Sequence, residues 1–533
     1  MYKRQDYDPL NDPYDRFTGF GVPPAKNGDY AFLLHMVRSL NDNGKAAIIL
    51  PHGVLFRGNA EHEIRKNLIK RKWIKGIIGL PPNLFYGTSI PACIIVLEKN
   101  GAEQREGIFI VNAGKGFIKD GNKNRLRERD IKKITDIFNG FTELDRYSRM
   151  VSFGEISKNE YNLNIPRYID SSEKEDRQDI EAHLKGGIPN SDLLNLEMYW
   201  KAFPGLKNDL FKTSNRNGYS DLKADIKSIR GIIENNAEFL DFSNKTQSIF
   251  DTWSKSSKDI LLNIGQGCKP KEIIKNLHNH ILKSFQSQVL IDMYEVFQVL
   301  MSYWDETMQD DCYIIAADGW QAKPQRIIES KKSKDGKITE KDKGWDCDLL
   351  PKSLLAERYF SDYLKELDSL ENKKEEFESK MAELVEEQIG DEGCFNDFEK
   401  INKGVISKHL KKIKDVEGFE EDVEIFKSYI HLMDQIAQAK KEIKSFDNSL
   451  DKLLLEKYTE LTKDEIKTLV IDDKWLNVIK NGVLRLIGQV VQDLNNSIVT
   501  LDRRYKNTLP ELNSKADQLE KKVEDHLKKM GFE

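Results

Sequence analysis

The stretch NDPYDRFTGFG, residues 11–21, holds the residue types that two kinds of chemistry need. In NDPY, the Asn11 side chain and a proline carbonyl could accept hydrogen bonds from an amino group, while Tyr14 could stack on an extruded base. In FTGFG, which begins at Phe17, two glycines could let the backbone approach a bound methyl donor. Both kinds of site require particular elements around them.

Neither short motif has the surroundings that such sites require. A donor-binding glycine turn follows a hydrophobic strand and leads into a helix, but the preceding DPLNDPYDR is polar and Val22, Pro23 and Pro24 follow. Prolines there oppose a clean helix start. In NDPY, Asp12 also replaces the first proline of the Asn-Pro-Pro-aromatic pattern. We interpret NDPY as a surface turn of the Asx-Pro kind and FTGFG as unrelated to donor binding.

Residues 28–111 alternate between helical and strand patterns. Apolar residues recur at helical spacing in GDYAFLLHMVRSL, from Gly28, and HEIRKNLIKRK, from His62. Short apolar runs predict strands at AAIILP up to Pro51, Trp73–Leu80, Ile90–Lys99 and GIFIVNA from Gly107. This order is typical of the second half of a doubly wound sheet, yet only 27 polar, proline-rich residues precede it. We therefore expect an incomplete Rossmann-like α/β sheet with an aggregation-prone open edge.

After about residue 170 the pattern is mostly helical. We expect three parts: the α/β part at 1–170, a helical middle region at 171–350 with a loop-rich insert, and a helical, coiled-coil tail at 351–533. The insert is AADGWQAKPQRIIESKKSKDGKITEKDKGWDCDLLPK.

Two runs in the tail have heptad spacing. They are Tyr363, Leu367, Leu370, Lys374, Phe377, Met381 and Leu384, and Ile425, Tyr429, Leu432, Ile436, Ala439, Ile443, Phe446, Leu450 and Leu453. Such a seam indicates either a coiled coil between subunits or an internal helical hairpin, and the pattern alone does not separate the two.

Composition excludes several classes of protein. A net charge of -5 over 533 residues is not that of a protein that wraps DNA, so nucleic-acid contacts must be local or supplied by a partner. No apolar run of about 18 residues and no signal pattern support a membrane span or export. Five scattered cysteines form no CxxC pair, so we expect no disulfide framework, no metal site and a reducing, cytoplasmic location.

A longer and more specific signal runs from Gly28 to Lys99. It consists of GDYAFLLHMVRSL, ILPHGVLFRGNAEHEIRKNLI and IIGLPPNLFYGTSIPACIIVLEK, followed downstream by DGNKNRLRERD, NLNIPRYID, GWDCDLLPKSLLAERYF, IDDKWL and HLKKMGFE. In this order the segments resemble the methylation subunit of type I restriction-modification systems, an adenine-specific DNA methyltransferase. The resemblance extends over essentially the whole chain after about residue 8.

The resemblance implies an activity and its partners. Members of this family transfer a methyl group from S-adenosylmethionine to the N6 atom of adenine in double-stranded DNA. Two methylation subunits bind one specificity subunit, and a restriction (motor-nuclease) subunit joins them. In the family, DPYDRFTGFGVPP lies just downstream of the donor-binding F-x-G-x-G and the catalytic Asn-Pro-Pro-Phe. We therefore expect this chain to lack both motifs, to carry no catalytic residue and to be inactive alone.

The first residues indicate why those motifs are absent. MYKRQ resembles the translation of a transposon-end adapter used in library preparation, so we expect the sequence to begin at an assembly break. A genuine short N-terminus is the alternative.

Residues that could still do chemistry follow the strand ending at Leu80. By resemblance, Phe85 matches the aromatic residue that packs on the flipped adenine, and we place Asn83 and Tyr86 with it in the target-base pocket. An aromatic face can restore about 1–3 kcal/mol of stacking to an extruded base. The alternative is that Phe85 and Tyr86 plug the loop into the core.

Two further groups are candidates for DNA contacts. His52 and Arg57 follow the strand AAIILP. Since methylation of an amine needs no nucleophilic triad, we expect both either to order the loop or to face DNA, and we name Arg57 as the candidate DNA contact. A basic strip that could touch phosphates comprises Lys119, Lys123, Arg125, Arg127 and Arg129, of which we favour Lys123, Arg125 and Arg127. Interleaved Asp120, Glu128 and Asp130 leave a solvated helix start as the alternative.

A function of a different class competes with the enzyme. The chain could be a non-catalytic assembly module that binds the specificity subunit through its helices. An independent coiled-coil scaffold is a third interpretation, which leaves the half-sheet unexplained.

Overall fold

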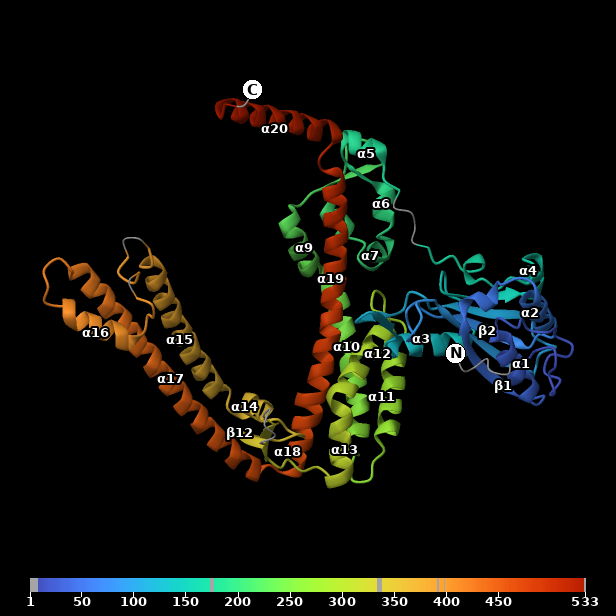
Figure 1. Ribbon diagram of the computed structural model, residues 1–533, viewed down its shortest axis with the longest axis horizontal. Coiled ribbons are helices and arrows are strands. Elements are labelled where there is room, and N and C mark those ends of the chain that lie inside the picture. Colours follow the sequence, from blue (N-terminus) through green and yellow to red (C-terminus); the bar gives the residue numbers. More distant parts are fainter. Residues whose placement is uncertain (1–7, 173–176, 333–337, 391–392, 397, 532–533) are drawn as a thin grey trace. The chain divides into compact units, whose positions relative to one another are not determined.

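The computed structural model describes residues 8–172, 177–332, 338–390, 393–396 and 398–531 (Figure 1). The MYKRQ segment lies outside the described residues. The chain divides into two compact units, one with residues 1–251, 278–302 and 482–533 and the other with residues 252–277 and 303–481. The division into parts at 1–170, 171–350 and 351–533 stays a prediction.

Unit 1 begins with a five-stranded mixed sheet, blue to cyan in Figure 1. Its strands are β1 (Lys45–Pro51), β2 (Ile74–Gly79), β3 (Ala92–Glu98), β4 (Gly107–Asn112) and β7 (Ser148–Ser152). They lie in the order β1-β3-β2-β4-β7, in which β2 and β4 are parallel and the other neighbours are antiparallel. The four strands expected from apolar runs are confirmed, and the sequence pattern missed β7.

Helices cover both faces of this sheet. They are α1 (Asp29–Ser39), α2 (Ala60–Lys70) and α3 (Glu128–Gly140). The apolar spacing of α1 places Leu33, Leu34 and Val37 on one side, where they are buried with Ile64 and Leu68 of α2 in the larger core. The two helices expected from periodicity are thereby confirmed.

The opposite face of the sheet has a smaller core under α3. Ile134, Ile137 and Phe138 of α3 pack with Phe109 of β4 and Ile78 of β2. The rings of Phe109 and Phe138 meet edge to face at 6.1 Å between centroids. This core fixes the end of β2 from which the candidate site extends.

Strand β1 forms one outer edge of the sheet. Ile49, paired in register with Ile94, remains 54% exposed, and no strand pairs with the outer side of β1 within the described part of the chain. Glu98 at the end of β3 forms ion pairs with Lys45 of β1 at 2.6 Å and Lys75 of β2 at 2.7 Å. Burial alone would raise the pKa of Glu98, but these lysines hold it below its ordinary value.

Short elements join the strands of this sheet. They are η2 (His52–Leu55), β5 (Ile118–Asp120), β6 (Lys123–Arg125), α4 (Phe153–Lys158) and η3 (Ile165–Arg167). Strands β5 and β6 pair antiparallel as a small hairpin.

The rest of unit 1 is mostly helical. Its short elements are α5 (Ile180–Lys185), β8 (Ile188–Pro189), α6 (Asn190–Leu194), α7 (Glu197–Ala202), α8 (Leu206–Leu210), β9 (Phe211–Thr213), β10 (Tyr219–Leu222), η4 (Ile226–Ser228) and α9 (Ile229–Asn235). The longer helices, which have residues in both units, are α10 (Ala237–Leu262), α11 (Pro270–Phe285), α12 (Met293–Tyr303) and α19 (Asn477–Tyr505). Gly482 lets α19 approach α12, since a Cβ there would lie 2.3 Å from a methyl carbon of Val299.

Unit 2 contains a buried ion pair between helices that have π-type turns. Its helices here are η5 (Trp304–Met308), α13 (Gln309–Asp318) and η6 (Leu469–Leu476). The Lys474 ammonium lies 2.8 Å from Asp311 Oδ2 and donates to the Leu349 carbonyl at 2.8 Å. The Trp475 indole N–H also donates to Asp311, at 2.7 Å. Because both charged side chains are at least nine-tenths buried, this pair depends on its mutual contacts.

The segment expected to be a loop-rich insert contains a β-hairpin. Strands β11 (Gln325–Lys332) and β12 (Ile338–Asp346) pair antiparallel, and α13 extends into the segment's first residues. The loop prediction was therefore wrong there. Alternation of charged side chains on a two-stranded ribbon produces no apolar run, which is why the strands were missed.

The helical tail forms an internal hairpin. Its helices are α14 (Lys352–Tyr359), α15 (Ser361–Glu387), α16 (Lys403–Ile413), α17 (Glu420–Glu460) and α18 (Lys463–Thr468). The two heptad runs lie on α15 and α17, which pack against each other: the rings of Tyr363 and Phe446 are 5.7 Å apart, and Lys440 pairs with Glu378 at 2.9 Å. The sequence left open a coiled coil between subunits or an internal helical hairpin, and these contacts within the chain are those of the internal hairpin.

The last described helix, α20 (Leu509–Lys529), buries none of its side chains. Leu512, Leu519 and Val523 lie on one helical face and are 46%, 61% and 56% exposed. Across the described residues, no helix combines the length and apolar character needed to cross a membrane.

Candidate functional site

The candidate site is the loop of residues 80–91 that joins β2 to β3. Because β1 and β2 both run antiparallel to β3, their carboxyl ends meet at the same edge of the sheet. The His52 N–H, just after β1, donates to the Pro91 carbonyl at 3.0 Å and so ties the end of β1 to this loop. The carboxyl edge is where α/β sheets bind their ligands.

The loop is closed at its neck and turns sharply at its tip. The Asn83 N–H donates to the Ser89 carbonyl at 3.3 Å. Asn83 has φ of 54° and Gly87 has φ of 77°, and a side chain at Gly87 would be strained for that reason alone. The structure therefore brings the three predicted pocket residues into one tight turn.

The two aromatic side chains of this turn have different surroundings. Phe85 is half-buried and packs against the core under α3. Tyr86 is 94% exposed, so nothing in the described chain supports its ring. Of the two rings, only that of Phe85 anchors the loop to the core, as the alternative to a base-pocket role expected of both. The base-pocket roles of Asn83, Phe85 and Tyr86 stay predictions.

The β5–β6 hairpin lies directly against the loop. The Lys123 ammonium donates to the carbonyl oxygens of Phe85 at 2.9 Å and Thr88 at 3.2 Å. The neighbouring Arg125 points away and pairs with Asp120 at 3.2 Å, with both side chains exposed. The DNA-contact predictions for Lys123 and Arg125 are not tested by these contacts, but the Lys123 cation already has two acceptors.

Arg57 belongs to a network that orders the segment after β1. Its guanidinium lies 2.7 Å from Asp29 and 3.3 Å from Glu61, and the Glu61 carboxylate also accepts from the Asn27 amide at 2.8 Å. Burial raises the pKa of Glu61, and the positive charge of Arg57 opposes that shift. Contact between Arg57 and DNA stays a prediction, beside a loop-ordering role that these ion pairs would serve.

His52 lies between the loop and this network. Burial lowers the pKa of its imidazole, and its Nε2 atom is buried without a hydrogen-bond partner in the described residues. The His52 imidazole therefore has one ring nitrogen without a partner in the described residues, just after the carboxyl end of β1.

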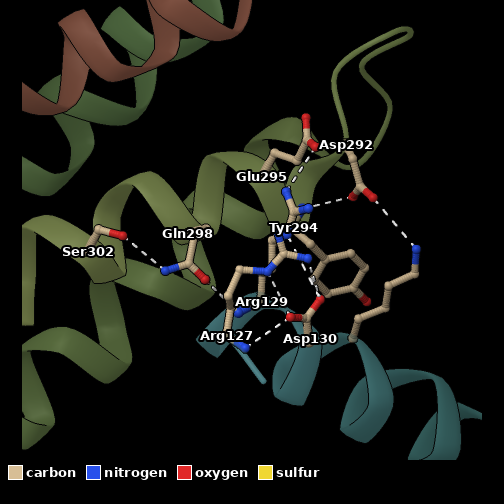
Figure 2. A network of polar contacts seen from close by, with 9 residues as sticks. Arg127, Arg129, Asp130, Asp292, Tyr294, Glu295, Gln298 and Ser302 are labelled. Carbon is tan, nitrogen blue, oxygen red and sulfur yellow. Dashed lines mark hydrogen bonds and ion pairs between the residues drawn. The ribbon is translucent and has the colours of Figure 1, made fainter. Parts of the chain in front are cut away.

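The remaining arginines of the basic strip hold helices together (Figure 2). Arg127 caps α3 by donating to Asp130 at 2.8 and 3.0 Å. Burial would raise the pKa of Asp130, but these bonds hold it below its ordinary value. Arg129 lies 2.9 Å from Glu295 of α12, whose Gln298 accepts from the Arg129 N–H at 3.0 Å. Contact between Arg127 and DNA stays a prediction.

The opening motifs have packing roles in the structure. Phe17 and Phe20 of FTGFG are buried in the larger core, and the Arg71 guanidinium lies 4.2 Å from the Phe20 ring centroid. In NDPY, Asp12 accepts from Arg16, at 2.6 Å from its N–H, which closes a turn. No strand precedes these residues in the described chain, and α1 begins only at Asp29. Both features agree with the interpretation of NDPY as a turn and of FTGFG as unrelated to donor binding.

Metal chemistry has no candidate cluster here. Within the residues that the structure describes, no three His, Cys, Asp or Glu side chains are arranged to hold a metal ion. The five cysteines are free thiols, and burial raises the pKa of Cys93 to about 12.

Comparison with known proteins identifies the class. The family described as N-6 DNA Methylase matches residues 2–177, which contain the whole sheet and its carboxyl-edge loop. Residues 2–177 of the chain match this family, and over this part the resemblance to methylation subunits of type I restriction-modification systems is confirmed.

Two curated relatives are methylase subunits of type I restriction enzymes. The chain is 36% identical over 176 residues to a type I restriction enzyme methylase subunit of Methanocaldococcus jannaschii, a match that covers 32% of this chain and 30% of that protein. It is 35% identical over 194 residues to a type I methylase subunit of Haemophilus influenzae, with 34% and 44% covered. The chain thus spans less than half the length of these curated relatives.

A solved structure adds a third comparison. The type I restriction-modification methyltransferase subunit from Streptococcus thermophilus is 44% identical and superimposes with a TM-score of 0.28, covering 30% of this chain and 34% of that one.

Proposed function

We propose that this chain is the C-terminal part of an adenine-specific DNA methyltransferase subunit of a type I restriction-modification complex. The observation that carries the proposal is the closed loop with Asn83, Phe85 and Tyr86, at the carboxyl edge of a sheet within the family segment. In this proposal the loop forms one wall of the pocket for an extruded adenine. Stacking on an aromatic ring offsets about 1–3 kcal/mol of the cost of extrusion.

The residues present do not fit S-adenosylmethionine. The glycine turn nearest to a donor motif, at Phe17–Gly21, turns its aromatic rings into the core, and its Gly19 carbonyl accepts from Arg71 at 3.3 Å. That backbone is therefore already engaged and offers no cradle for a ligand. We infer that the donor and the motif that polarises the adenine amino group are supplied by another segment, so that this chain alone is inactive.

The outer edge of β1 supports the proposal that another segment supplies the donor and the catalytic motif. It is a largely apolar edge strand with exposed Ile49 and unpaired backbone groups in the described chain, a feature that stable proteins normally cover. A strand added parallel to β1 would end at the same edge as β1 and β2. A catalytic motif at its carboxyl end would then face the loop of residues 80–91. In this proposal the sheet is the second half of a methyltransferase sheet.

Methyl incorporation into duplex DNA tests the proposal. The purified chain, incubated with radiolabelled S-adenosylmethionine and DNA, should incorporate no label above a protein-free control. The chain combined with a donor-bearing segment of a type I methylation subunit and a specificity subunit should incorporate label at adenine. Incorporation by the chain alone, or none by the assembled complex, would overturn it.

The partners form part of the same proposal. The relatives are methylase subunits of type I restriction enzymes, and we propose a specificity subunit, a second methylation subunit, a restriction subunit and double-stranded DNA as partners of this chain. We also propose a cytoplasmic location, where such a complex would encounter DNA.

A non-catalytic assembly module is the second candidate, favoured by α20. This helix exposes an apolar face with no cover in the described structure, as expected of a surface that binds a partner helix. Co-purification with a specificity subunit, in the absence of methylation by any assembled complex, would favour this function over the enzyme.

A further inference from the structure

We propose that Lys123 is a positioning residue that holds the loop of residues 80–91 in the shape that presents Tyr86 to the target base. The inference rests on the proposed function and adds to it the β5–β6 hairpin, whose role would otherwise be only to link β4 to α3.

The contacts of Lys123 reach both sides of the loop tip. Its ammonium donates to the carbonyls of Phe85 and Thr88, the residues on either side of the Tyr86–Gly87 turn. One cation thus restrains the backbone on both sides of the tip, and with it the point from which the exposed Tyr86 ring extends. Hydrogen bonds to a charged group are stronger than neutral ones, and the half-buried position of Lys123 limits their screening by water.

Asn124, the next residue of the hairpin, holds the first limb of the loop. Its side-chain amide donates to the Pro82 carbonyl at 2.6 Å, and its backbone N–H donates to the Asn83 carbonyl at 3.0 Å. Asn124 is only 4% exposed, so its side chain is enclosed between hairpin and loop. The hairpin and loop therefore meet through four hydrogen bonds to four different carbonyls.

The loop has little other support at its tip. Its neck is closed by the 3.3 Å bond between Asn83 and Ser89, at the long end of the range for such bonds. Tyr86 itself has no buried contact that could select one position for its ring. The Lys123 bonds preorganise the backbone that carries this exposed aromatic side chain, which lowers the entropy lost when a base stacks on it.

The first arm of the test uses the purified full chain. Lys123→Met keeps most of the side-chain volume and removes the donor. Lys119→Met, on the same hairpin, is the matched control for loop exchange, since the Lys119 ammonium lies 5.7 Å from the centroid of the Phe117 ring. In hydrogen exchange, the loop amides that are protected at Asn83 and Ile90 should exchange about tenfold faster in Lys123→Met, as expected for the loss of bonds from a charged donor. Equal exchange rates of these amides in both variants would overturn the positioning role of Lys123.

The second arm uses the methyltransferase complex that contains this chain. With 2-aminopurine at the target position, Lys123→Met should reduce the fluorescence increase that accompanies base extrusion and lower kcat about tenfold. The Kd for DNA should stay within about twofold, because no phosphate contact is lost. A weaker Kd with unchanged kcat would instead identify Lys123 as a phosphate contact and overturn the positioning role.

The two proposals fail in different ways. If the complex with the unaltered chain does not methylate DNA, the proposed function fails, whatever Lys123 does to the loop. If that complex is active and Lys123→Met leaves kcat and fluorescence as they are with the unaltered chain, the positioning role alone fails.

Discussion

Removing the carboxylate of Asp311 tests the most enclosed polar contact of the chain. In Asp311→Ala, the Lys474 ammonium would lose its counterion while the Leu349 carbonyl remained, and the Trp475 N–H would lose its acceptor. The Lys474 side chain is only 10% exposed, so water could not replace the lost partner without opening the surrounding helices.

The size of the effect follows from that burial. Truncating one partner of a buried ion pair costs about 3–5 kcal/mol because it leaves an uncompensated charge in a medium of low polarity. Local opening of η6 should therefore become at least about 100-fold more frequent, at roughly 1.4 kcal/mol for each factor of ten.

Hydrogen exchange of peptides from residues 303–318 and 469–481 measures this opening directly. Asp310→Ala, at the exposed neighbouring carboxylate, is the matched control and should leave exchange unchanged. The double variant Asp311→Ala with Lys474→Met should be more protected than Asp311→Ala alone, because it contains no unpaired charge. Exchange in Asp311→Ala within tenfold of the unaltered chain would refute the reasoning.

Three further predictions concern the sheet, the loop and the last helix. Glu98→Gln should lower the midpoint of thermal unfolding near neutral pH. Because the folded pKa of Glu98 is depressed, the stabilisation from its carboxylate is present above about pH 4.3 and is lost as the pH falls through the folded pKa. The unfolding midpoints of the variant and the unaltered chain should therefore become equal in acid. Phe85→Ala should reduce methylation by the assembled complex about 5- to 100-fold, measured as kcat/KM, whereas an unchanged value would remove Phe85 from the base pocket. Leu512→Glu with Leu519→Glu should abolish co-purification with a specificity subunit without altering helical circular dichroism, since both side chains are exposed; undiminished binding would assign the contact to another surface.

Much of the sheet could be predicted because its strands contain short apolar runs, and β2, β3 and β4 are largely buried on both faces. Runs such as AAIILP and IKGIIG have no competing helical period, and helices with apolar spacing separate them. Strand β7 was missed because SRMVS is short and alternates at an edge, and β11 and β12 were missed because their residues are mostly charged. Edge strands and isolated ribbons lack the burial on which such patterns depend.

The candidate site was only partly accessible from sequence. Local order predicted that Asn83, Phe85 and Tyr86 share one turn, but not that the two aromatic rings would differ in burial. Lys123 stands 35 residues beyond Thr88 and Arg129 stands 166 residues before Glu295, and a charge in a mixed-sign run does not indicate which distant acceptor it meets. Such pairings are properties of the fold and have no local signature.

The closed neck of the loop has a consequence for how this protein can change. Since Asn83 and Ser89 join the two ends of the turn, the residues between them are insulated from the register of β2 and β3. Substitutions at the exposed Tyr86 can therefore alter the tip without shifting the sheet, whereas Leu84 and Phe85 are packed against the core under α3. The exposed tip is therefore the part of the loop where natural variation or design could change the contacts of the carboxyl edge at the lowest cost in stability.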